Sequence, residues 1–156
     1  GVIFDLSVHD MDIVSSLANS EVIKVSAFGN NFVSDNFEDH VSIQLHYRNS
    51  IIAVCETSWI APIRVRDLTM ISDSHYIFLD YLEQKIKVFS TNESGKMVVD
   101  EILVPKKESL VSELNDFLNS IINKTHPKVT GLDGLKAVKL AEAAVESMKT
   151  GKTINL

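Results

Sequence analysis

The spacing of hydrophobic and polar positions changes several times along the chain. The first residues form an apolar run that predicts a short strand, which breaks into a helix over residues 8–17. A period of two then predicts strands at residues 22–28, 41–48, 51–59, 65–72, 76–81, 85–90 and 97–104. Helical spacing returns over residues 108–124 and again from Asp133 to a stop at Gly151, before a short closing strand at 153–156.

Strands that are grouped together and followed by grouped helices are typical of an α+β fold. We therefore expect two layers, with a mostly antiparallel open sheet of about six to seven strands and helices packed on one face. Alternation is strongest over residues 41–48. There the apolar set is Val41, Ile43, Leu45 and Tyr47, and the polar set is Ser42, Gln44, His46 and Arg48. The polar face has no covering element in the chain, so it is either solvated or pairs with another subunit.

Capping residues and apolar spacing predict where the first and last helices begin and which face of the last one is buried. Ser7 followed by Asp10 predicts a capping box for the first helix, and Asp133 is the expected cap of the last one. The expected buried stripe of that last helix comprises Leu135, Val138, Leu140, Ala141, Ala144, Val145 and Met148.

Composition narrows the class of protein. The chain has 156 residues, of which 45% are hydrophobic, and this suits one globular domain. Its single cysteine, Cys55, reads as a small buried strand residue and favours a reducing, cytoplasmic location. The net charge of −6 without a basic stripe argues against a nucleic-acid partner, and no apolar run approaches the ~20 residues of a membrane span. The start at Gly1 on an apolar run suggests a segment cut from a longer polypeptide.

Asp5 and His9 are the strongest candidates for chemistry. An acid and an imidazole four residues apart are the parts of a general base with its orienting partner. His9 is expected at the second helical position, where unpaired backbone N–H groups disfavour the imidazolium form and leave a neutral ring that accepts a proton. The alternative is that His9 faces solvent at a helix start and Asp5 is an ordinary turn acid.

Other kinds of site find little support. The remaining histidines lie on different elements without metal-ligand spacing, so we expect no metal site. The sequence contains no G-x-S-x-G nucleophile elbow and no G-x-G-x-x-G or Walker-type phosphate loop, so we expect no cofactor-binding residues.

The segment from Trp59 to Arg66 is a second candidate. Arg64 and Arg66 alternate along a predicted strand, where they would clamp a phosphate or carboxylate beside the Trp59 ring. Solvent-facing charges on a sheet are the alternative interpretation.

Three stretches carry a family resemblance: GVIFDLSVHDMDIV, ETSWIAPIRVRDLTMIS and TGLDGLKAVKLAEAAVESMKTGKTINL. Together they resemble the C-terminal domain of the glucose-fructose oxidoreductase / inositol dehydrogenase / rhizopine-catabolism (Gfo/Idh/MocA) family. The resemblance implies a sheet of the glyceraldehyde-3-phosphate dehydrogenase C-terminal type. It implies that residues 1–156 form a substrate-binding and oligomerisation domain, with a Rossmann domain that binds NAD or NADP lying upstream.

The resemblance also implies an activity. The full-length protein would be an NAD(P)-dependent dehydrogenase that oxidises a ring hydroxyl of a sugar, nucleotide-sugar or cyclitol, and the fragment alone would be inactive. His9 would be the acid/base, Asp5 would orient the hydroxyl, and Trp59, Arg64 and Arg66 would bind substrate. The W-x-x-P-x-[KR]-x-R stretch is most similar to members that oxidise UDP-N-acetylglucosamine at C3.

The resemblance has two further consequences. The open sheet implies a homo-oligomer. Residues 72–75 depart from the family, which usually has a glycine-containing turn there, so this hairpin is the doubtful part of the match. A catalytically silent sheet module for oligomerisation or ligand sensing remains the competing hypothesis.

Overall fold

The computed structural model describes residues 1–156 and divides them into two compact units. The first unit comprises Gly1–Ala61 and His126–Leu156, and the second comprises Pro62–Thr125. The predicted α+β class is confirmed. Its strands are divided between two four-stranded antiparallel sheets, one in each unit, where the sequence suggested a single sheet.

The sheet of the first unit has the strand order β3-β2-β1-β8. Its strands are β1 (Val22–Asn30), β2 (His40–Tyr47), β3 (Ile52–Ser58) and β8 (Ile154–Asn155). The predicted alternation on β2 is confirmed, because the apolar set from Val41 to Tyr47 is buried and its polar neighbours are not. The turn to β3 places Ser50 at φ 69°, and register pairs Ile43 of β2 with Ala27 on one side and Cys55 on the other.

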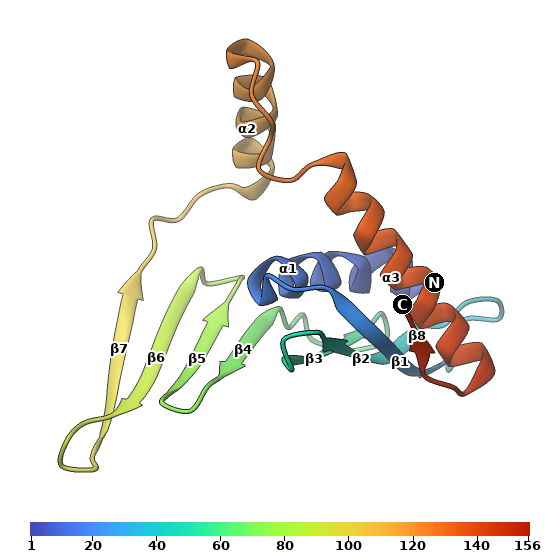
Figure 1. The fold of residues 1–156 in the computed structure, drawn as a ribbon, viewed down its shortest axis with the longest axis horizontal. Coiled ribbons are helices and arrows are strands. Elements are labelled where there is room, and N and C mark those ends of the chain that lie inside the picture. The colour runs from blue at the N-terminus through green and yellow to red at the C-terminus, as the bar shows by residue number, and fades with distance from the viewer. The chain divides into compact units, whose positions relative to one another are not determined.

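Two helical segments cover one face of this sheet (Figure 1). A π-helical turn, η1 (Ile3–Ser7), runs directly into α1 (Val8–Ala18), and α3 (Gly131–Thr150) packs beside α1. The strand predicted for the opening apolar run is therefore wrong. Ile3 and Ser7 are buried while Phe4 and Asp5 are exposed, and that spacing of four is helical.

Both predicted helix caps need correction. Ser7 has helical backbone angles and caps nothing; its hydroxyl instead bonds that of Thr57 on β3, because the helical path has already begun at Ile3. At α3 the N-cap is Thr130, and Asp133 is the third residue of a capping box whose Oδ2 lies 2.9 Å from the Thr130 backbone nitrogen.

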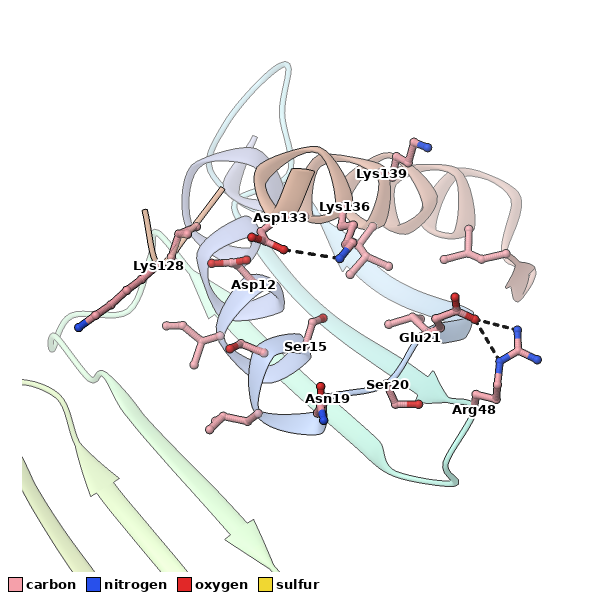
Figure 2. Close-up of a pocket in the computed structure, with 18 residues that line it drawn as sticks. Asp12, Ser15, Asn19, Ser20, Glu21, Arg48, Lys128, Asp133, Lys136 and Lys139 are labelled. Carbon is pink, nitrogen blue, oxygen red and sulfur yellow. Dashed lines mark hydrogen bonds and ion pairs between the residues drawn. The ribbon is translucent and has the colours of Figure 1, made fainter. Parts of the chain in front are cut away.

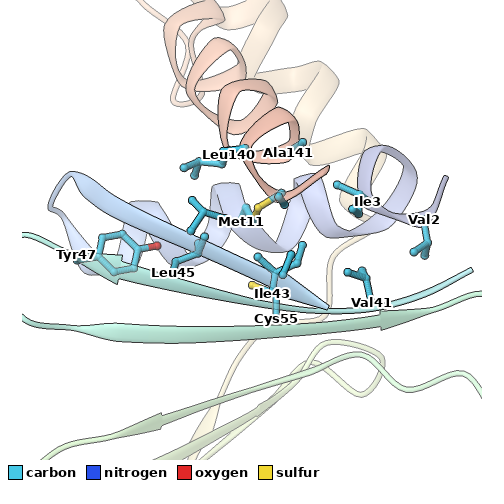
Figure 3. Packing of buried hydrophobic residues seen from close by; sticks show 14 of the residues in the cluster. Val2, Ile3, Met11, Val41, Ile43, Leu45, Tyr47, Cys55, Leu140 and Ala141 are labelled. Carbon is cyan, nitrogen blue, oxygen red and sulfur yellow. The ribbon is translucent and has the colours of Figure 1, made fainter. Parts of the chain in front are cut away.

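The core of the first unit lies between the sheet and these helices (Figure 3). Met11 of α1 and Leu140 and Ala141 of α3 pack over Ile43 and Leu45. The buried stripe of α3 is shifted from the prediction: Ala137, Leu140, Ala141 and Ala144 are buried, whereas Leu135 and Val138 are 50% and 41% exposed. The alanines allow α3 to approach the sheet closely, since they carry little side-chain volume.

The second unit contains the other sheet, with strand order β4-β5-β6-β7, and one helix. The elements are β4 (Asp67–Ile71), β5 (His75–Asp80), β6 (Lys85–Thr91), β7 (Met97–Leu103) and α2 (Ser109–Asn123). The hairpin at residues 72–75 closes without glycine: the Ser72 N–H donates to the His75 carbonyl at 2.9 Å, and no residue of the turn has a positive φ.

The second unit lacks a buried apolar core. All of its apolar side chains are at least partly exposed, and only Ser120 is buried. The apolar stripe of α2, predicted from helical spacing, is exposed along its whole length. The exposed fraction of its side chains ranges from 51% at Leu114 to 73% at Ile122. None of the helices in the two units has the length and hydropathy that a membrane-spanning helix requires.

Candidate functional site

Two side-chain bonds attach the η1 turn to the end of β3. The Ser7 and Thr57 hydroxyls bond to each other in a buried position. Two residues away on each segment, the indole Nε1–H of Trp59 donates to Asp5 Oδ2 at 2.8 Å. Because the two contacts are spaced by two residues on each side, they fix the orientation of η1 on the strand end as well as its position.

Glu38 accepts hydrogen bonds from the backbone N–H groups at the start of the helical segment. Its carbonyl oxygen accepts the Val2 N–H at 2.9 Å, and its Oε1 accepts the Ile3 N–H at 3.1 Å. These N–H groups begin the helical path and have no partner within it, so Glu38 supplies the missing acceptors. A carboxylate also complements the positive end of the helix dipole there.

Asp39 organises the loop that carries Glu38. Its buried carboxylate accepts three consecutive N–H groups, from Phe32 at 3.0 Å, Val33 at 2.7 Å and Ser34 at 2.9 Å. Burial acts to raise the pKa of this carboxyl, but the three donors outweigh it and hold the pKa below its usual value. The Asp39 carbonyl oxygen accepts the Trp59 backbone N–H at 2.8 Å, so the same residue fixes the end of β3.

His9 lies exposed on α1, one turn after Asp5. No hydrogen bond or ion pair engages its ring, and the bonding partner of Asp5 is Trp59 and not His9. The expectation that His9 sits at a free helix N-terminus is wrong, because η1 precedes α1 and the Val8 N–H already bonds carbonyls of that turn. The turn that carries Asp5 is π-helical, and such turns are frequent at functional sites.

The structure brings together three of the five predicted site residues. Asp5, His9 and Trp59 all belong to the first unit, at η1, the start of α1 and the end of β3. Arg64 and Arg66 belong to the second unit and precede β4, so their predicted place on a strand face is wrong. Both arginines are exposed, and no hydrogen bond or ion pair engages either guanidinium group.

Other nucleophiles and ligands are poorly placed. Burial raises the pKa of the Cys55 thiol to about 12, with the charge of Asp10 adding to the effect, so this cysteine is not a thiolate at neutral pH. No group of three or more His, Cys, Asp or Glu side chains is arranged to hold a metal ion.

A groove also runs between α1 and α3, but it lacks convergent chemistry (Figure 2). Its charged side chains largely neutralise one another: Arg48 bonds Glu21 at 2.9 Å, and Lys136 pairs with Asp133 at 3.5 Å. Neither Asp5 nor His9 lines it. The η1 turn with the start of α1 is therefore the better candidate site.

Glu38 and Asp39 are the residues that sequence reasoning missed. They lie between the predicted strands at 22–28 and 41–48, where no site residue was expected, and the structure has a loop at residues 31–39. The available signal was a pair of acids directly before a strand, at the end of a loop rich in Asn and Ser, whose many backbone N–H groups need acceptors.

Comparison with known proteins finds a family model, curated relatives and solved structures that resemble this chain. Residues 1–79 match the family model described as the GFO/IDH/MocA C-terminal domain. UDP-N-acetylglucosamine 3-dehydrogenase from Acidithiobacillus ferrooxidans is 27% identical over 93% of this chain and 47% of its own length. Myo-inositol 2-dehydrogenase from Thermotoga maritima is 23% identical over 100% of this chain and 49% of its own. The chain thus spans about half the length of the curated relatives it matches.

Solved structures show the same fold. The A. ferrooxidans UDP-N-acetylglucosamine 3-dehydrogenase structure matches with a TM-score of 0.87 at 22% identity, over 96% of this chain and 48% of that one. A levoglucosan dehydrogenase in complex with NADH and L-sorbose also matches with a TM-score of 0.87, at 16% identity, over 99% of this chain and 50% of that one. At these identities the agreement concerns the fold alone.

Proposed function

Because this chain belongs to the Gfo/Idh/MocA family, through the C-terminal domain of that family, we propose that it is the substrate domain of a dehydrogenase. The reaction would oxidise a ring hydroxyl of a sugar, nucleotide-sugar or cyclitol. The observation that carries the proposal is the placement of Asp5 and His9 one turn apart on an exposed helical start, with Asp5 held by Trp59.

The two residues divide the work on the hydroxyl. His9, which is exposed and has no partner in the chain, is free to accept the hydroxyl proton at a ring nitrogen as the carbonyl forms. Asp5 presents its Oδ1 atom, which accepts no bond within the chain, to orient the same or a neighbouring hydroxyl. A general base contributes roughly 10²- to 10⁴-fold to such a step.

The residues of this chain do not fit a nicotinamide dinucleotide. Dinucleotide sites lie at the ends of parallel strands beside a glycine-rich turn, whereas both sheets here are antiparallel. Oxidation also removes a hydride, and no group in residues 1–156 is built to accept one. We place the NAD or NADP site in an upstream domain.

The names of two curated relatives support a proposal for the substrate class. One curated relative is named for UDP-N-acetylglucosamine and another for myo-inositol, so we propose a polyhydroxylated ring.

The test is turnover by the full-length polypeptide that contains these residues. A panel of cyclitols, sugars and UDP-sugars is screened with NAD and NADP by following formation of the reduced nicotinamide. With an active substrate, His9→Ala should lower kcat by about 10²-fold or more, whereas His126→Ala, at an exposed histidine before α3, should change little. Equal turnover of both variants would contradict the assignment, and no activity with any substrate would favour a silent module.

We also propose that the open face of the first sheet joins two copies of the chain. Register places Phe28, Ser42 and Glu56 in one row across that face and Lys24, His46 and Ile52 in another. Phe28 is 72% exposed and Val54 on the same face is 61% exposed, which is unusual unless another surface covers them. Phe28→Asp should convert the oligomer to monomers in sedimentation velocity, and an unchanged sedimentation coefficient would contradict this.

A further inference from the structure

We propose that Trp59 is a positioning residue for Asp5, and this role rests on the proposed function of Asp5. The indole Nε1–H donates to Asp5 Oδ2 at 2.8 Å, across a sequence separation of 54 residues. Trp59 was expected to contact substrate, but its only polar side-chain atom is occupied by the carboxylate. The contact selects which oxygen of Asp5 remains available.

Trp59 is well placed to hold another side chain. Its backbone N–H donates to the Asp39 carbonyl at 2.8 Å, and Asp39 is in turn fixed by three amide bonds to residues 32–34. Two residues earlier, Thr57 bonds Ser7 of η1. The indole is thus anchored on the same strand end that anchors the helical turn carrying Asp5.

The anchoring matters because Asp5 is exposed. A carboxylate on a helical surface samples several rotamers, and its oxygens are then presented in many directions. The bond from the indole restricts these rotamers and leaves Oδ1 as the free acceptor. Misplacement of a catalytic group by about 1 Å costs up to about 10²-fold in rate, so the indole N–H acts on turnover through Asp5.

A stacking role would give a different result. If Trp59 acted by stacking on a sugar ring, Trp59→Phe would retain an aromatic face, and any loss would appear in KM. If it acts by donating to Asp5, Trp59→Phe removes the N–H and lowers kcat, while Trp59→His supplies a ring N–H again.

The first measurement uses the chain itself and needs no activity. Trp59 is the only tryptophan, so a ¹H–¹⁵N spectrum contains a single indole cross-peak. We expect Asp5→Ala to move this peak strongly toward the position of a solvent-exposed indole. Asp12→Ala, which removes an acid further along the same helix, should leave it in place. An indole peak that is the same in Asp5→Ala and in the unchanged protein would overturn the proposed contact.

The second measurement uses the full-length enzyme with an active substrate. Trp59→Phe should lower kcat by roughly 10- to 100-fold with little change in KM, and Trp59→His should recover a substantial part of that loss. Trp59→Phe with unchanged kcat, or with a change confined to KM, would overturn the positioning role. If the full-length protein oxidises no substrate, the proposed function fails, but the spectrum still decides whether Trp59 holds Asp5.

Discussion

The two units of the chain have similar sheets but opposite interiors. Both contain four antiparallel strands, yet every buried apolar side chain belongs to the first unit. There, α1 and α3 cover one sheet face and bury residues such as Ile43 and Leu45 completely. In the second unit, strand pairing and turn bonds organise the sheet without a covered face.

An alternating strand pattern alone does not produce a buried core. Sheets with strong alternation bury one face only where a helix with small residues can approach, as α3 does through Ala137, Ala141 and Ala144. The candidate site lies on the unit that has this rigid support. Asp5 and His9 stand on a helical segment whose opposite face, at Ile3 and Met11, is fully buried.

The largest expected difference between the units comes from removing a buried side chain. Ile43→Ala should lower the free energy of unfolding of the first unit by about 2–5 kcal/mol, because transfer and cavity terms add in a packed core. Urea unfolding followed by the fluorescence of Trp59, which lies in this unit, measures it. The matched change Ile71→Ala, at a residue that is 78% exposed in the second unit, should cost within about 0.5 kcal/mol. Equal losses would contradict the comparison.

Asp39→Asn should give the next largest effect. The change removes a buried charge that accepts three backbone N–H groups, and bonds to charged groups contribute about 1.5–3 kcal/mol. Asp35→Asn, on an exposed acid of the same loop, is the control. A loss of stability in Asp35→Asn that equals that in Asp39→Asn would mean that loop charge in general, and not the Asp39 bonds, is responsible.

The same substitution should change the dependence of stability on pH. The pKa of Asp39 is lowered in the folded state, so the charge contributes stability above the unfolded value of about 3.9. That contribution is lost as the pH falls through the folded value. Asp39→Asn should therefore show a shallower loss of stability in acid, and an unchanged slope would indicate that other carboxyls govern it. Asp133, whose pKa is also lowered, mainly by its bond to Thr130, contributes in both proteins.

Much of the fold was predictable from sequence. The alternation on β2, the approximate positions of the strands after residue 20 and the end of α3 at Gly151 depend on local spacing and turn residues, and these agree with the structure. The opening segment was not predictable, because a short apolar run fits a strand as well as a helical turn. Its bonds to Glu38 and Thr57, distant in sequence, decide between them.

The site was predictable only in part. The spacing of Asp5 and His9 marked both residues as candidates, since the motif is local, and the structure places them on η1 and at the start of α1. The indole contact and the bond from Trp59 to Asp39 join residues 54 and 20 positions apart, and no local pattern encodes such pairs. Arg66 was misplaced because the predicted strand began at residue 65, two residues before β4 begins at Asp67, and Arg64 precedes even the predicted strand.

Helix caps should show a smaller effect that differs between the units. Thr130→Ala removes the capping box of α3 and should lower the free energy of unfolding of the first unit by about 1 kcal/mol. Glu108 caps α2 by accepting the N–H groups of Leu110 and Val111. Because α2 has no buried apolar face, Glu108→Ala should only increase hydrogen exchange in the first turn of α2. A global loss of stability in Glu108→Ala would show that α2 is coupled to a core.

The smallest effect is expected on the apolar stripe of α2 and tests the comparison most directly. Leu118 is 53% exposed, whereas Leu45 on β2 is fully buried. Leu118→Glu places a charge where solvent is already present. The free energy of unfolding obtained from a urea titration should therefore change by no more than about 0.5 kcal/mol. Leu45→Glu buries an unpaired charge and should prevent folding of the first unit. If Leu118→Glu also unfolded the chain or lowered its helix content, the α2 stripe would be packed in solution, and the contrast between a cored and a coreless unit would fail.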